Sequence, residues 1–255
     1  MRRGEWAESV PISGIECVGE VESCPGGEFT PGTPVAAMMG GLGRTIPGGY
    51  AEYTVVRVGN VVPLGEVGEA GGKGVMGLSW AELAALPESY VTAWTCLFRN
   101  LEVERGMTLL IRGATSAFGR AAVNLAVEKG AVVTATTRSE GRVDELRELG
   151  ANDVVADGGL GLGERLREQG KTERFDRVLE LVGNSVVVES LGLVKRGGRL
   201  CLAGWLGGLD PIPGPEGEER LRGFNPLCRW LVACILASLG ALFVGRRSFR
   251  CQMCR

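Results

Sequence analysis

The region from Met107 to Ala203 alternates short apolar runs with longer segments whose apolar residues fall on one helical face. Short apolar strands that alternate with helices indicate a parallel sheet covered on both faces. Because the connections in such sheets are right-handed, this α/β pattern predicts a doubly wound parallel sheet. We expect strands at Leu109–Arg112, Val132–Thr136, Asp153–Ala156, Phe175–Leu181 and Arg199–Ala203, and helices at Ala117–Lys129, Ser139–Leu149, Gly163–Gln169 and Asn184–Val194.

The first sixty residues follow a different pattern. They are rich in glycine, proline and valine, and their short apolar runs separated by turn residues indicate β-strands. We expect strands within Pro34–Met39 and Tyr50–Val56, and loops at Gly40–Gly49 and Val61–Gly77. Three parts are therefore predicted: a β domain at 1–95, an α/β domain at 96–208, and a tail at 209–255.

Two helices are predicted where the β domain meets the α/β domain. Ser79 can cap a helix N-terminus, with Glu82 three residues later answering it. Pro87 breaks an α-helix, so it divides the apolar residues that follow Ser79 into two helices.

The composition excludes several functions. The chain has no histidine, so a Ser-His-Asp hydrolase or a metallohydrolase is not expected, and no metal site is predicted. A net charge of −2 gives no electrostatic reason to expect nucleic acid as a partner. A signal peptide is not expected at Met1–Val10. A cytoplasmic protein with reduced thiols is expected, because the scattered cysteines lack metal-ligand spacing: Cys17, Cys24, Cys96 and Cys201.

The most informative segment joins the first predicted strand of the α/β domain to its first helix. Gly113 permits a tight turn, Gly119 lets the helix lie close to the strands, and the first amides of the helix suit a pyrophosphate. Ser116 and Ala117 stand where many dinucleotide-binding turns have glycine, so a plain strand–helix turn is the alternative. The surrounding alternation favours dinucleotide binding in a Rossmann fold, by Gly113, Ser116, Ala117, Phe118 and Gly119.

The residues after the second strand indicate which dinucleotide is bound. Proteins that bind NAD usually carry an acidic residue here, which holds the ribose hydroxyls. This chain instead offers Arg138, Ser139 and, one turn later, Arg142. Arginine forks and a hydroxyl suit a 2′-phosphate, so NADP(H) is predicted; the alternative is a solvated helix start.

Several segments occur in the order found in one family, and together they cover about Pro11–Trp205. They resemble the zinc-free, quinone-oxidoreductase-like (zeta-crystallin-like) reductases of the medium-chain dehydrogenase/reductase superfamily. The segments are Pro11–Gly19, Gly48–Tyr53, Ala84–Pro87, Thr92–Trp94, Gly113–Gly119, Thr136–Ser139, Leu149–Ala151, Glu180–Gly183 and Gly197–Arg199.

The resemblance implies a fold and an activity. It implies a GroES-like β domain and a zinc-independent transfer of hydride from NADPH to a quinone or an activated double bond, with a small molecule as substrate. It also places Val182, Gly183 and Gly204 near the nicotinamide, and Thr92 near the cofactor at the domain junction. For Gly183 and Gly204 the alternative is simple turn formation. No catalytic residue is predicted.

Both ends of the chain depart from this family. The first strands of the family's catalytic domain have no counterpart before Pro11, so we expect an incomplete GroES-like domain and a longer chain upstream. After about Leu227 the resemblance stops, and the arginine- and cysteine-rich tail suggests a frameshift or a splicing artefact. The apolar run Trp230–Gly245 is short for a spanning helix, so membrane attachment is an alternative that we do not favour.

Three hypotheses for the function remain at this point. The first is an NADPH-dependent reductase of quinones or of activated alkene or carbonyl compounds. The second is a non-catalytic remnant that holds NADP(H) without turnover, and the third is a tail-anchored membrane protein. A homodimer is possible, because the family pairs through a strand in the region of the tail.

Overall fold

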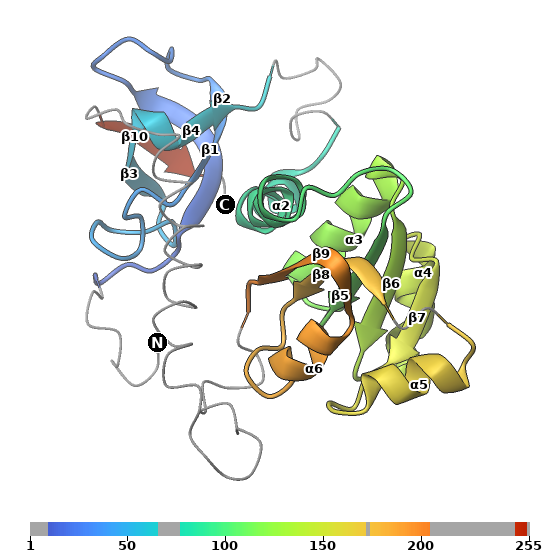
Figure 1. Cartoon of the computed structure of the whole chain (residues 1–255). Helices are drawn as coiled ribbons and strands as arrows, with labels where there is room; N and C mark the ends of the chain where they lie inside the picture. The colour runs from blue at the N-terminus through green and yellow to red at the C-terminus, as the bar shows by residue number, and fades with distance from the viewer. Residues whose placement is uncertain (1–9, 66–76, 172–173, 205–247, 254–255) are drawn as a thin grey trace. The chain divides into compact units, whose positions relative to one another are not determined.

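The computed structural model describes residues 10–65, 77–171, 174–204 and 248–253, and these form two compact units (Figure 1). One unit contains the described part of the chain up to Glu88 together with the strand near the C-terminus, and the other begins at Ser89. The sequence led us to expect a boundary at residue 95, whereas the structure divides the chain inside the helix that begins at Pro87.

The first unit is built on an antiparallel β-sheet, which is the kind of domain expected from its sequence. Its strands are β1 (Glu16–Ser23), β2 (Pro34–Met38), β3 (Tyr53–Arg57), β4 (Val61–Pro63) and β10 (Ser248–Met253), in the order β3-β10-β1-β2-β4. Buried and exposed residues alternate along β3, because successive side chains of a strand point to opposite faces. The buried core of this unit consists of Cys17, Val21, Val35, Ala37, Leu42, Val56 and Val61.

The sequence analysis did not single out three strands of this sheet. It named no strand at Glu16–Ser23, where β1 forms. We expected Val61–Gly77 to be loop, but β4 follows the 3₁₀ turn η1 (Val58–Asn60) and pairs with β2 through Val61 and Ala37. Strand β10 lies in the tail and pairs with both β1 and β3. Polar and apolar residues alternate along β10, so its signal was present, whereas β4 is too short to show one and forms by pairing with β2.

Helix α1 (Trp80–Ala84) begins as predicted. The Ser79 hydroxyl oxygen accepts a hydrogen bond from the Glu82 amide at 3.3 Å, and the Glu82 carboxylate accepts one from the Ser79 amide at 2.8 Å. Pro87 starts the second helix, α2 (Pro87–Trp94), which continues into the π-helical turn η2 (Thr95–Asn100).

The second unit is built on a parallel five-stranded sheet, which confirms the predicted doubly wound Rossmann fold. Its strands are β5 (Thr108–Arg112), β6 (Val132–Thr137), β7 (Asp153–Ala156), β8 (Phe175–Glu180) and β9 (Val194–Leu202), in the order β7-β6-β5-β8-β9. Leu109, Leu110 and Ile111 of the central strand are all fully buried. Burial of successive residues on both faces explains why this strand reads as one apolar run in the sequence.

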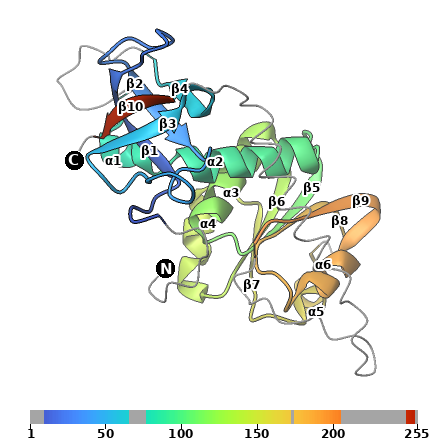
Figure 2. The ribbon, with the colours of Figure 1, turned by 90° about the vertical axis from the view of Figure 1, so that its left-hand side faces the viewer.

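Helices cover both faces of the parallel sheet (Figure 2). On one face lie α3 (Ala117–Lys129) and α4 (Val143–Glu148), the latter preceded by the 3₁₀ turn η3 (Glu140–Arg142). On the other lie α5 (Leu162–Glu168) and α6 (Val187–Gly192). A core cluster joins α5 to the strands, and its buried members are Leu110, Val155, Leu162, Leu166, Phe175, Val178 and Leu193.

The largest difference from the expected boundaries in this unit is at β9. The strand begins at Val194 rather than at Arg199, while α6 ends at Gly192, within the predicted helix. The first residues of β9 are largely exposed, and the pairing of β9 with β8 shifts register between Phe175 and Arg177. An exposed, irregularly paired strand start carries no apolar run, so the sequence pattern begins only where β9 becomes buried.

Candidate functional site

A cavity of about 570 Å³ opens in the second unit where β5, β6, β7 and β8 end. Open parallel sheets bind ligands at the carboxyl ends of their strands, at the point where the strand order reverses, which here lies between β5 and β8. The volume is in the range of small-molecule sites. Five of the predicted cofactor-binding residues line the cavity: Gly113, Ser116, Arg138, Arg142 and Val182.

The turn between β5 and α3 has the geometry predicted for it. Gly113 has φ +86°, a left-handed conformation that glycine adopts without strain. Ser116 is the N-cap of α3, and its hydroxyl oxygen accepts a hydrogen bond from the Gly119 amide at 3.0 Å. A Cβ atom on Gly119 would lie 2.6 Å from the Gly113 carbonyl oxygen, so the helix approaches the turn as closely as only glycine allows.

Ala117 and Phe118 are the first two residues of α3. The first amides of a helix have no acceptor within the helix, and the helix dipole favours an anion beside them. None of Ala117, Phe118 and Gly119 is among the residues that line the cavity. Any contact of these residues with a phosphate would therefore use their backbone amides.

The end of β6 supplies hydroxyl groups and positive charge. The Thr136 hydroxyl oxygen accepts a hydrogen bond from the Gly113 amide at 3.1 Å, which ties the turn between β5 and α3 to the neighbouring strand. The Thr137 hydroxyl donates to the Ser139 carbonyl oxygen at 3.2 Å and accepts from the Ser139 amide at 3.1 Å. Ser139 thus has its backbone engaged in a local turn, and it does not line the cavity.

The two predicted arginines differ in their environment. Arg142 forms a bidentate pair with Glu145, with distances of 2.7 Å from Nε to Oε2 and 3.0 Å from Nη2 to Oε1, and Glu145 also pairs with Arg120 at 2.8 Å. The hydrogen bond from Arg142 lowers the pKa of Glu145. Arg138 is exposed, and no described residue engages its guanidinium group. Of these two arginines, Arg138 is the one whose guanidinium group no described residue engages, so it is the better placed to meet a phosphate.

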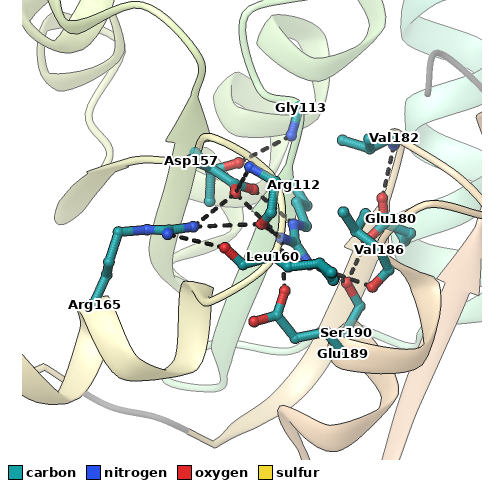
Figure 3. A network of polar contacts seen from close by, with 12 residues as sticks. Arg112, Gly113, Asp157, Leu160, Arg165, Glu180, Val182, Val186, Glu189 and Ser190 are labelled. Carbon is teal, nitrogen blue, oxygen red and sulfur yellow. Dashed lines mark hydrogen bonds and ion pairs between the residues drawn. The ribbon is translucent and has the colours of Figure 1, made fainter. Parts of the chain in front are cut away.

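The end of β8 is organised by a buried carboxylate. Glu180 is fully buried, and its Oε1 accepts hydrogen bonds from the amides of Val182 at 2.7 Å and Gly183 at 3.2 Å. The Ser190 hydroxyl donates to Oε2 (Figure 3). Burial raises the pKa of Glu180, although the Ser190 and Val182 hydrogen bonds and the charge of Arg112 oppose the shift. The amides of Val182 and Gly183 are therefore occupied within the protein.

Two other predicted residues lie away from the cavity. Thr92 is half-buried in α2. A Cβ atom on Gly204 would lie 2.3 Å from the Leu181 carbonyl oxygen, so close backbone packing alone requires glycine there. Gly183 has φ +108°, which also agrees with the simple turn reading. Contact between these residues and a cofactor stays a prediction.

The sequence analysis missed several residues that line the cavity. Thr115, Thr136, Thr137, Ser185 and Val186 belong to the ends of predicted strands and to the turns after them, and the segment Asp157–Leu160 follows β7. A rule that every segment after a parallel strand faces the same edge would have found them. The same rule would not have found Arg112, which is fully buried at the end of β5. Its position in an apolar strand does not show which residues it pairs with.

Among the residues that the structure describes, no group of three or more cysteine, aspartate or glutamate side chains could hold a metal ion. The cysteines at 17, 24, 96 and 201 form no disulfide bond with one another. No helix in the described ranges is both long and apolar enough to cross a membrane. The apolar run Trp230–Gly245 lies outside the described residues.

Comparison with known proteins agrees with this architecture. Residues 117–223 match the family described as zinc-binding dehydrogenase. The quinone oxidoreductase of Rattus norvegicus is 25% identical over 200 residues, which cover 72% of this chain and 58% of that protein. The crystal structure of AibC is 25% identical, with a TM-score of 0.70, and the match covers 95% of this chain and 74% of that one.

A third match is the yhdH oxidoreductase of Salmonella enterica, whose crystal structure is a complex with NADP. It is 20% identical, with a TM-score of 0.64, and the match covers 94% of this chain and 75% of that one. At this identity the likeness shows the fold alone. The chain spans less than two thirds of the rat relative's length.

These matches extend over both units and not only over the widespread nucleotide-binding fold. The family model, the relatives and the structural matches together support a quinone-oxidoreductase-like member of the medium-chain dehydrogenase/reductase superfamily, as the motifs of the sequence predict.

Proposed function

We propose that this chain is an NADPH-dependent oxidoreductase that transfers a hydride, without zinc, to a quinone or to another activated alkene or carbonyl compound. The observation that carries the proposal is the cavity at the strand ends, which has the Ser116-capped turn on one side and the free Arg138 on the other. The rat relative named quinone oxidoreductase and the Salmonella protein solved with NADP support it.

The residues present fit a dinucleotide with a 2′-phosphate. The close approach of α3 to the turn at Gly113 and Gly119 leaves no room for a Cβ atom at 119, and the first amides of α3 would hold the pyrophosphate. Arg138 would hold the 2′-phosphate through charge-assisted hydrogen bonds. When bound, NADPH supplies the hydride, and the chain supplies position and electrostatics.

The absence of zinc from the proposed reaction rests on the residues of the chain. The family description names zinc, but the chain has no histidine. The described part also lacks a cluster of acidic or cysteine side chains with which to bind a metal ion. A polarising metal is not needed for hydride transfer to a quinone, because the quinone is already electron-poor.

Titration calorimetry of the purified chain with NADPH and NADH tests the cofactor, and NADPH oxidation with a panel of quinones and enones tests the activity. We expect tighter binding of NADPH and turnover of at least one acceptor. A folded protein that binds neither nucleotide would refute the proposal.

Binding of NADP(H) without turnover is the second candidate. It is favoured by one observation, namely that the match covers 58% of the length of the rat relative, so a large part of that protein has no counterpart in the match. NADPH binding together with no turnover of any acceptor in the panel would select this candidate.

A further inference from the structure

Arg112 occupies the last position of β5, next to the turn residue Gly113, and its side chain is fully buried. Its guanidinium forms a two-point ion pair with Asp157, with distances of 2.6 Å from Nε to Oδ2 and 3.2 Å from Nη2 to Oδ1 (Figure 3). It also donates to Glu189 Oε2 at 2.9 Å and to Ser190 Oγ at 3.0 Å. Burial would lower the pKa of Arg112, but the hydrogen bond and charge of Asp157 raise it, so the group stays charged.

One arm of this network leads to the segment after β8. Ser190 accepts a hydrogen bond from Arg112 and donates its own proton to Glu180. Glu180 in turn accepts the amides of Val182 and Gly183. Arg112 also donates directly to the Val186 carbonyl oxygen at 3.3 Å. The segment lines the cavity through Val182 and Val186, and it is therefore tied to Arg112 at its far end directly and at Val182 and Gly183 through the Ser190 hydroxyl.

The other arm leads to the segment after β7. Asp157 accepts the Gly159 amide at 3.0 Å and pairs with Arg165 at 3.1 Å, while Arg112 donates to the Gly159 carbonyl oxygen. Asp157 and Gly159 both line the cavity. Arg112 thus forms hydrogen bonds with both wall segments of the cavity, although it does not line the cavity itself.

A buried charged network of this kind is poorly explained by stability alone. Removing charges from water is costly, and well-packed apolar residues of similar volume often give equal or greater stability. What such a network does provide is a fixed geometry, because each charge must keep its partners. The groups it orients here are segments of the candidate dinucleotide site.

We propose that Arg112 is a positioning residue that sets the spacing of the Asp157–Leu160 and Val182–Val186 segments around the dinucleotide, acting on Val186 directly and on Val182 and Gly183 through Ser190 and Glu180. The inference rests on the proposed function for the identity of the ligand. It adds that the Val182–Val186 segment faces the nicotinamide half of the cofactor, because the ends of β6, which carries Arg138 for the 2′-phosphate, and of β8 lie on opposite sides of β5.

The Ser190→Ala variant tests this link, because it removes the hydroxyl between Arg112 and Glu180 and leaves every charge in place. We expect the Kd for NADPH, measured by calorimetry, to rise about tenfold, the consequence of one lost buried hydrogen bond. The Kd for 2′,5′-ADP, which lacks the nicotinamide half, should not change. Ser23→Ala is the control: it removes a serine hydroxyl at an exposed position of β1, outside the network, so both affinities should stay as in the unaltered chain.

Hydrogen exchange provides a readout that needs neither a ligand nor a variant. The amides of Val182 and Gly183 should exchange more slowly than exposed loop amides in the unaltered chain, and faster in Ser190→Ala. Equal weakening of NADPH and 2′,5′-ADP by Ser190→Ala would show a merely structural role and overturn the proposal, as would unprotected amides at these positions in the unaltered chain. Failure of the unaltered chain to bind either nucleotide would refute the cofactor instead, while slow exchange of the two amides would still support the positioning role.

Discussion

At the scale of single residues, the candidate site depends on a few close contacts. A Cβ atom at Gly119 would collide with the backbone of the turn between β5 and α3. Of the two predicted arginines, Arg142 is held by Glu145, whereas Arg138 is not. Both features lead to predictions in which a neighbouring residue of the same type serves as the control.

Gly119→Ala should destabilise the protein. The new Cβ atom would lie 2.6 Å from the Gly113 carbonyl oxygen and 2.7 Å from Ala114 backbone carbon atoms, so the backbone has to shift. We expect the free energy of unfolding to fall by about 1–3 kcal/mol, the usual cost of overpacking, as measured by urea denaturation. Gly141→Ala is the control, because the nearest atom to its new Cβ atom would be Ser139 Oγ at 3.8 Å, an ordinary contact. Similar losses in both variants would contradict the explanation by close approach.

Arg138→Glu should weaken NADPH binding more than NADH binding. The change replaces the free cation that faces the cavity with an anion, which would repel a 2′-phosphate and leave a 2′-hydroxyl little affected. We expect the Kd for NADPH to rise at least about tenfold. Arg147→Glu, on α4 and paired with Asp144, reverses the same charge away from the cavity and should have little effect. Equal effects of Arg138→Glu on both nucleotides would rule out the 2′-phosphate assignment.

At the scale of secondary-structure elements, side chains at the starts of the strands reinforce the pairing of the parallel sheet. Asp176 of β8 accepts hydrogen bonds from the Thr108 amide at 2.8 Å and the Thr108 hydroxyl at 2.7 Å, and it pairs with Lys195 of β9 at 3.0 Å. One carboxylate therefore joins β5, β8 and β9. Burial would raise the pKa of Asp176, but these hydrogen bonds and the charge of Lys195 lower it to about 2.

Asp176→Asn should make the stability of the protein less dependent on acid pH. Because the folded-state pKa lies below the ordinary value of 3.8, the carboxylate stabilises the fold above about pH 4, and this contribution is lost as the pH falls towards 2. The Asp176 side chain is 32% exposed and therefore partly screened by solvent, so we expect a loss on the order of 1 kcal/mol at pH 7, measured by denaturant titration across pH. The difference from the unaltered chain should vanish near pH 2. Asp144→Asn, at an exposed ion pair, is the control, and an equal loss there would count against the role of Asp176.

At the scale of the whole molecule, the candidate site is built by one of the two units. The described residues that line the candidate site all belong to the unit that begins at Ser89, whereas the N-terminal unit gathers strands from both ends of the described chain. The site therefore depends on a sheet whose strands follow one another in the sequence.

Saturating NADPH should protect the nucleotide-binding unit selectively. At a ligand concentration of 100 times Kd, binding stabilises the folded state by about 2.7 kcal/mol, so hydrogen exchange should slow first at the segments after β5, β6, β7 and β8. The core of the strands β1–β4 should show little change. Uniform slowing over both units, or none at the strand ends, would contradict the location of the site.

The sequence by itself determined the parallel sheet, the Ser79 cap of α1 and the helix break at Pro87, because each depends on neighbours in the chain: apolar runs, a cap and a residue without an amide hydrogen. Only the tertiary structure decided that Val61–Pro63 is a strand, that Ser248–Met253 pairs with β1 and β3, that Arg142 is held by Glu145, and that Arg112 links two walls of the cavity. Strand pairing and buried ion pairs join residues far apart in sequence. Their energies depend on which groups the fold brings together, and no local pattern encodes that.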